Sequence, residues 1–258
     1  MSVRIQLITR GDDAGSCHSA NSAILQACDS GTLRNVSLMV PGPAFESAAK
    51  LFADRSDVCL GLHVTLNSEW DAVKWGPVLP AQQVPSLVDE NGHFWPTPTT
   101  LHERGLDPDE AMAEIEAQLR HARAAGLNLS YIDEHMGVSW VGGLRERIRA
   151  LAEREGLIDA FKFEGLPSVQ NAHAGLLERW QAQLQDAQPG AYVIVTHPGR
   201  DEDDMRQMSM HSQGWQPGSV AQERDAERQA LCDPKFVQVC RNSDVQLARY
   251  SEVARAPK

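Results

Sequence analysis

Short apolar, β-branched runs alternate along the chain with longer segments in which apolar residues recur every three or four positions. The runs favour buried strands, and the longer repeat favours helices that pack on a core. The pattern predicts strands over Val3–Thr9, Val36–Val40, Val58–Val64, Leu129–Asp133, Phe161–Phe163, Ala191–Thr196 and Val245–Arg249. It predicts helices over Ser19–Asp29, Ala44–Ala53, Pro108–Ala125, Gly143–Glu155, Ala174–Asp186 and Ser219–Leu231, with a short helix near Pro234–Cys240.

This alternation is typical of an α/β protein in which helices connect the strands of a parallel sheet. About seven parallel strands favour a distorted, barrel-like β/α fold over a small open sheet, and an open doubly wound sheet stays as the alternative. We expect one catalytic domain over residues 1–258, with a long insertion at about residues 67–107. A second long irregular stretch covers Pro198–Gly218. Loops of this length in compact domains are usually functional or mobile.

The formal net charge of −11 argues against nucleic acid or an anionic membrane surface as a partner. The five cysteines are odd in number and include no C-x-x-C pair, which indicates reduced thiols rather than a disulfide framework. The N-terminus lacks the apolar core of a signal peptide, and no run approaches the roughly 18 apolar residues of a membrane span. We therefore expect a cytoplasmic protein that acts on a small molecule; a homodimer stays open.

Residues able to bind metals or protons stand at the ends of four predicted strands. Asp12 and Asp13 follow the first, His63 ends the third, His135 follows the fourth, and His197 follows the sixth. Taken singly, each has an ordinary explanation as a turn residue, a helix cap or a core histidine. However, the carboxyl ends of parallel strands meet at one edge of a β/α fold, where active sites form. The shared position therefore predicts a single site.

One carboxylate and two imidazoles make a three-ligand site with open positions, which is the pattern of a catalytic rather than a structural metal. One aspartate of the Asp12–Asp13 pair, together with His63 and His135, would supply these ligands. The other aspartate and His197 would then supply a general base and a general acid. Asp133, two residues before His135, could accept a proton from a ring nitrogen. These donors suit one divalent ion, zinc first, with manganese, cobalt, nickel and magnesium as alternatives.

Around these positions the chain resembles the YdjC/ChbG-like carbohydrate deacetylase family, also called the ChbG/HpnK family. The matching segments are Leu7–Gly15, Leu60–Leu66, Tyr131–Gly137, Thr196–Gly199 and the late Gln222–Leu231. The resemblance runs from residue 3 to about residue 250. It implies a barrel-like fold of the polysaccharide-deacetylase kind and hydrolytic removal of an acetyl group from an N-acetylated, chitooligosaccharide-like sugar.

The resemblance also implies roles for single residues. Asp12 would be the general base, and His197 would be the general acid or the partner on the oxyanion side. The metal ligands would be Asp13, His63 and His135. The two aspartates could exchange roles. Many relatives carry further histidines after the third ligand, where this chain has Met136–Ser139. This difference leaves the three ligands intact, but it means that the sugar specificity of those relatives does not transfer to this chain.

Three tryptophans in the long insertion, Trp70, Trp75 and Trp95, are candidates for substrate binding, and Trp215 is similar. Aromatic faces suit the apolar faces of sugar rings, but such residues equally well pin a loop that has no core of its own.

Two rival functions stay open. One is a metal-dependent phosphoesterase or amidohydrolase, although no second cluster of ligands for a two-metal site is evident. The other is a non-catalytic sugar-binding protein on the same fold, against which the intact acidic and histidine residues argue.

Overall fold

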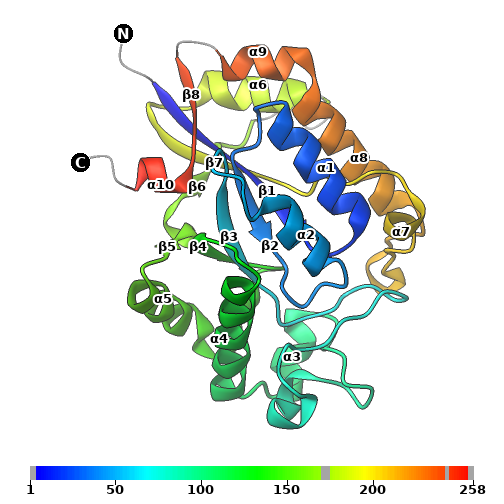
Figure 1. The fold of residues 1–258 in the computed structure, drawn as a ribbon. Coiled ribbons are helices and arrows are strands. Elements are labelled where there is room, and N and C mark those ends of the chain that lie inside the picture. The colour runs from blue at the N-terminus through cyan, green and yellow to red at the C-terminus, as the bar shows by residue number, and fades with distance from the viewer. Residues whose placement is uncertain (1–3, 170–174, 242–243, 255–258) are drawn as a thin grey trace.

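The computed structural model describes residues 4–169, 175–241 and 244–254 (Figure 1). In these residues eight strands form one sheet, and every strand pair is parallel. Seven of the strands follow the order β5-β4-β3-β2-β1-β7-β6. The strands are β1 (Ile5–Ala14), β2 (Asn35–Leu38), β3 (Cys59–Val64), β4 (Leu129–Glu134), β5 (Ile158–Asp159), β6 (Glu164–Gly165), β7 (Gly190–Thr196) and β8 (Val245–Ala248).

The longest strand, β1, organises the sheet. It pairs along one edge with β7, and along the other edge first with β8 and then with β2. At the two ends of the seven-strand order, β5 and β6 are joined by only the four residues 160–163. Because so short a connection keeps those ends close together, the sheet curls into a half-barrel. The predicted distorted, barrel-like fold with about seven parallel strands is therefore confirmed, and β8 is an added branch.

The predicted strand over Phe161–Phe163 is wrong. Residues Ala160–Lys162 form a 3₁₀ turn between the two-residue strands β5 and β6. The carboxylate of Asp159 accepts a hydrogen bond of 3.1 Å from the backbone N–H of Phe161, which starts this turn. The apolar side chains of the segment suggested a strand, but the local Asp–backbone hydrogen bond competes with strand pairing.

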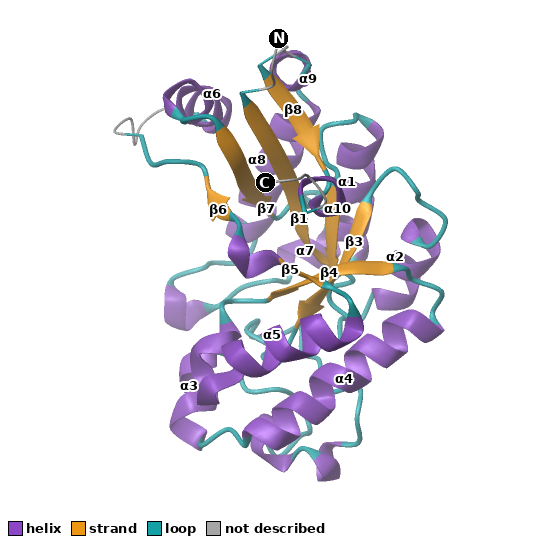
Figure 2. Cartoon of the chain, turned by 90° about the vertical axis from the view of Figure 1, so that its left-hand side faces the viewer, coloured by secondary structure: helices purple, strands orange, loops and turns teal. Residues whose placement is uncertain are grey.

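The helices cover the outside of the curled sheet, and α4 and α5 lie side by side beyond β4 (Figure 2). Seven helices coincide with predicted ones: α1 (His18–Asp29), α2 (Phe45–Phe52), α4 (Pro108–Ala124), α5 (Leu144–Glu155), α6 (Leu176–Asp186), α8 (Ser219–Cys232) and α9 (Pro234–Cys240). The first residue predicted for α6, Ala174, lies outside the described residues. Three short helices were not predicted: α3 (Pro98–Arg104), α7 (Asp203–Arg206) and α10 (Tyr250–Val253). Among the described helices, none is both long and apolar enough to cross a bilayer.

The long insertion between β3 and α4 is fixed to the body of the protein. The buried Glu114 of α4 accepts hydrogen bonds from the backbone N–H groups of Val78 (2.9 Å) and Leu79 (3.0 Å). The indole of Trp75, also buried, donates to the carbonyl of Asn67 at 2.8 Å. These contacts hold the start of the insertion over the carboxyl ends of the strands. The second irregular stretch is likewise packed, by the buried Met205, Met208 and Met210.

Candidate metal centre

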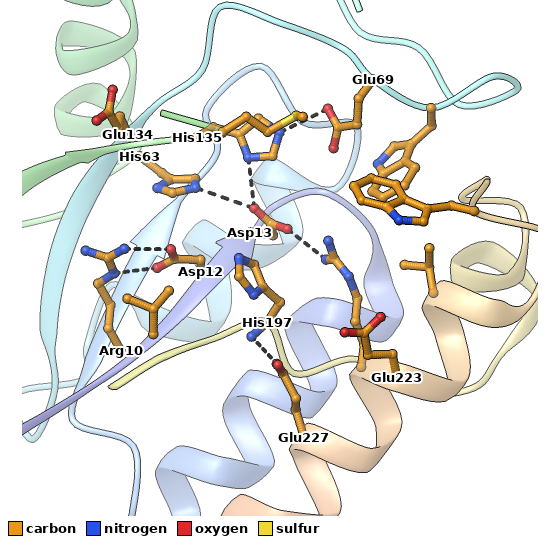
Figure 3. A pocket seen from close by; sticks show the side chains of 16 residues that line it. Arg10, Asp12, Asp13, His63, Glu69, Glu134, His135, His197, Glu223 and Glu227 are labelled. Carbon is orange, nitrogen blue, oxygen red and sulfur yellow. Dashed lines mark hydrogen bonds and ion pairs between the residues drawn. The ribbon is translucent and has the colours of Figure 1, made fainter. Parts of the chain in front are cut away.

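The two aspartates lie in a β-bulge of β1. The register against β2 shifts by one residue between Gly11 and Ala14, so that Asp12 and Asp13 together face the single residue Ser37. Asp13 has a φ of 66°, in the left-handed region that aspartate tolerates better than most residues. A bulge re-aims side chains at a strand end. Here it directs Asp12 and Asp13 to different partners (Figure 3).

Three buried donor atoms face one another at this edge. The Oδ1 atom of Asp13 lies 3.5 Å from Nε2 of His63 and 3.2 Å from Nδ1 of His135. Yet this oxygen, although buried, accepts no hydrogen bond of normal geometry. Leaving a buried carboxylate oxygen without a partner costs free energy, and a cation bound among the three atoms would remove that cost. The donor set and its spacing therefore fit a divalent metal ion.

Each histidine is oriented from behind by a carboxylate. Nδ1 of His63 lies 2.9 Å from Oδ1 of Asp133, and Nε2 of His135 lies 3.0 Å from Oε2 of Glu69. Such carboxylates fix the ring of a metal-binding histidine and turn its other nitrogen toward the ion. The sequence pointed to Asp133 but placed it beside His135. The β3–β4 register instead pairs Asp133 with His63.

Glu69 was missed by the sequence analysis. Its only signal was an acidic residue shortly after a candidate histidine, in a segment expected to be an insertion. The insertion folds back over the strand ends, and Glu69 is 3% exposed there.

Asp12 is held on the other side of the bulge by Arg10. The guanidinium donates two hydrogen bonds to Asp12, at 2.7 and 2.8 Å, and its third nitrogen lies 3.0 Å from Asp133. The Ser37 hydroxyl also donates to Asp133, at 2.7 Å. Paired guanidinium bonds of this kind fix a carboxylate in direction as well as in charge. Asp12 is therefore a buried, oriented carboxylate next to the candidate metal ligands.

Arg224, on α8, neutralises the third candidate ligand. Its Nη1 lies 2.7 Å from Oδ2 of Asp13, the carboxylate oxygen that faces away from the histidines. Burial raises the pKa of Asp13, but Arg224 and His135 outweigh that effect and hold the pKa well below its usual range. The carboxylate is thus ionised at neutral pH, as a metal ligand must be. The late segment Gln222–Leu231 was part of the family resemblance, but it gave Arg224 no role.

His197 lies directly after β7, and its backbone N–H donates to the carboxylate of Glu227 on α8. The imidazole faces the same pocket as the two aspartates (Figure 3). This pocket has a volume of about 380 Å³. The structure therefore brings together in one pocket all five residues that the sequence placed at the strand ends: Asp12, Asp13, His63, His135 and His197.

The tryptophans of the insertion occupy different places. Trp70 lines the pocket although it is only 3% exposed. Trp75 is buried, and the guanidinium of Arg104 lies 4.6 Å from the centre of the Trp95 ring. Neither tryptophan is among the described residues that line the pocket. Trp215, from the loop after His197, is 41% exposed and also lines the pocket, with its ring 5.7 Å from that of Trp70.

Comparison with known proteins places this site in context. A family model described as YdjC-like protein matches residues 6–179. A carbohydrate deacetylase of Thermoanaerobacter pseudethanolicus is 26% identical over 95% of this chain and 98% of its own.

Two solved structures share the fold. A protein of Enterococcus faecalis V583, described as a candidate cellobiose-phosphate cleavage protein, superposes with a TM-score of 0.78 at 20% identity, over 97% of this chain and 99% of its own. A peptidoglycan N-acetylglucosamine deacetylase superposes with a TM-score of 0.54 at 12% identity, over 96% of this chain and 87% of its own. At such identities these similarities show the fold alone, and that fold is the polysaccharide-deacetylase kind expected from the sequence.

Proposed function

The chain belongs to the YdjC-like protein family, and we propose that it is a metal-dependent carbohydrate deacetylase that releases acetate from an N-acetylated sugar. The observation that carries the proposal is the buried Oδ1 of Asp13, which accepts no hydrogen bond of normal geometry and faces the nitrogens of His63 and His135 beside the oriented carboxylate of Asp12. The carbohydrate deacetylases among its relatives support the reaction. Because the site draws side chains from Arg10 to Glu227, we also propose that residues 1–258 form one catalytic domain.

Asp13, His63 and His135 would hold one divalent ion, zinc in the first instance. The ion would polarise the acetamide carbonyl and lower the pKa of a water molecule. Asp12 accepts the proton of the attacking water, and the two hydrogen bonds from Arg10 keep its carboxylate in place. His197, which lines the same pocket, donates a proton to the departing amine. Glu227 holds the backbone of His197 and so positions its ring.

The test is acetate release from N-acetylglucosamine and its oligomers by protein stripped with a chelator and reloaded with zinc, manganese, cobalt, nickel or magnesium. We expect stripped protein to be inactive and one reloaded form to recover activity. A phosphatase panel on the same samples tests the rival phosphoesterase function. Metal uptake at one ion per chain without acetate release from any acetylated sugar would contradict deacetylation and favour a sugar-binding protein.

Metal binding should release protons. Burial lowers the pKa of both rings, but the carboxylates that face them, chiefly Asp133 and Glu69, raise the pKa of His63 to about 10 and that of His135 to about 9. Both rings therefore carry a proton at pH 7 in the metal-free protein, and an ion must displace about two protons to bind. We expect calorimetric titrations with zinc, in buffers of different ionisation enthalpy, to show this release and an affinity that increases from pH 6 to pH 9.

The same shifts set the pH dependence of the metal-free fold. Because each pKa is raised above the unfolded value of about 6.5, the stabilisation is fully present below that pH and is lost as the pH rises through 9 and 10. The melting temperature of metal-free protein should therefore fall over this range. Zinc binding without proton uptake by the buffer would show that the rings are neutral beforehand.

Replacing Glu69 by Gln should weaken metal binding without removing a ligand. The amide can donate to Nε2 of His135 or accept from it, but it no longer adds negative charge behind the ring. Loss of such a carboxylate typically reduces metal affinity roughly 10–100-fold. Competition with a zinc indicator measures the effect. Glu90→Gln, an exposed acid on the same insertion, is the matched control, and equal affinities for the two variants would show that Glu69 does not orient the histidine.

A further inference from the structure

A second group of candidate metal ligands lies on the other side of the His63 ring. It consists of Asp12, His63 and Asp133, whose donor atoms all lie within 4.8 Å of one another, and all three side chains are buried. Nε2 of His63 faces Asp13, whereas Nδ1 lies 2.9 Å from Oδ1 of Asp133. This group was not evident in the sequence, because Asp133 meets His63 only through the register of β3 and β4.

The guanidinium of Arg10 already places a cation in this second group. Its Nε and Nη2 donate to the two carboxylate oxygens of Asp12, at 2.7 and 2.8 Å (Figure 3). Its Nη1 lies 3.0 Å from Oδ2 of Asp133. One guanidinium thus bridges two carboxylates that are 3% and 2% exposed. Buried carboxylates that share a site repel each other, and a cation between them offsets that repulsion.

The Arg10 side chain is itself held in place. Its Nη1 also donates to the hydroxyl of Tyr250 at 3.3 Å, and Tyr250 is fully buried. The backbone N–H of Tyr250 donates in turn to the side chain of Asn35 at 2.9 Å. Only 12% of the Arg10 side chain is exposed. A buried guanidinium with a fixed direction and three partners is costly to displace, so we expect it to exclude a metal ion from the second group.

A guanidinium and a metal ion would leave Asp12 in different chemical states. A carboxylate has about four lone-pair sites, and the two hydrogen bonds from Arg10 use only some of them. The others stay free to accept a proton from water. A divalent ion would instead bind the carboxylate as a ligand and disfavour its protonated form. Asp12 could not then serve as a general base.

We propose that Arg10 fills a second metal site, formed by Asp12, His63 and Asp133, and so limits the protein to one ion and keeps Asp12 free as the base. This inference rests on the proposed function and adds to it the reason why one metal ion is bound. It also separates the protein from hydrolases that use two metal ions. Removing the guanidinium should open the second site to a divalent ion.

The test counts zinc ions per chain, by equilibrium dialysis against increasing zinc, for the wild type, Arg10→Gln and Arg120→Gln. Arg120 is an exposed arginine of α4, and its variant is the matched control. We expect one ion in the wild type and in the control, and two ions in Arg10→Gln. The second ion should bind more weakly than the first, because the two ions share one imidazole and repel each other. Adding Asp133→Asn to Arg10→Gln removes a ligand of the second site and should return the count to one.

A second measurement follows folding and turnover of the same variants. Metal-free Arg10→Gln leaves Asp12 and Asp133 without their shared cation, so its melting temperature should fall below that of the wild type. Zinc should then raise that temperature by more than it does in the wild type, because two ions bind the folded state. Acetate release by Arg10→Gln should fall roughly 10²-fold as the second ion binds, since Asp12 becomes a ligand. The wild type should show no such loss over the same zinc range.

The outcomes separate this inference from the proposed function. One ion in both the wild type and folded Arg10→Gln overturns the inference and leaves deacetylation standing. Two ions in the wild type, or two ions that persist after Asp133→Asn is added, overturn it as well. So does Arg10→Gln that stays unfolded at saturating zinc, because the second ion should replace the lost charge. A wild type that takes up no zinc overturns the proposed function together with this inference.

Discussion

His63→Ala is expected to abolish metal binding at micromolar zinc and to reduce acetate release at least roughly 10³-fold. The substitution removes one of three donors from a site that offers a single carboxylate and two imidazoles. Metal ions commonly stabilise the transition state of such hydrolyses by several kcal/mol. Since each 1.36 kcal/mol corresponds to a factor of ten in rate, the expected loss follows directly.

The measurement is metal content after dialysis, together with acetate release at equal protein and metal concentrations. Removing His63 leaves Asp133 with Arg10 and Ser37 as partners, so the carboxylate is not left bare and the chain should still fold. His121→Ala removes an exposed histidine from the surface of α4 and is the matched control. Full metal occupancy in folded His63→Ala would place the ion elsewhere and remove the basis of the proposed function.

Asp12→Asn is expected to keep the metal and lose turnover. The amide has nearly the shape of the carboxylate and can still accept a hydrogen bond from Arg10, but it cannot take a proton from water. Loss of a general base typically costs 10²–10⁴-fold, and we expect roughly this loss in kcat with little change in metal affinity. Asp54→Asn, on an exposed turn, controls for the change of charge.

The companion variant Asp13→Asn tests the assignment of the two aspartates. If Asp12 is the base, Asp13→Asn should lose metal while Asp12→Asn retains it. The opposite pattern would show that the two residues exchange roles. Near-full turnover by metal-loaded Asp12→Asn would contradict its assignment as the base.

The sequence alone determined most of the strands and helices and the residues at the strand ends that form the site. A strand such as β3, which is buried at every residue, is a nearly continuous apolar run, and such a run marks a buried strand from the local sequence alone. The same is true of α4, which begins at an Asp-Pro cap. Once parallel strands were inferred, the common edge of their carboxyl ends followed, and with it the grouping of Asp12, Asp13, His63, His135 and His197.

Only the tertiary structure decided the partners of these residues. Glu69 and His135 are separated by 66 positions in the chain and meet because the insertion folds over the strand ends. Asp133 pairs with His63 because of the register between two strands, and Arg224 reaches Asp13 because α8 packs beside β1's bulge. The packing likewise buries Trp75 and leaves Trp140 exposed. Such contacts depend on how distant segments pack, and a pattern of apolar and polar positions limits which face is buried without fixing which neighbour lies there.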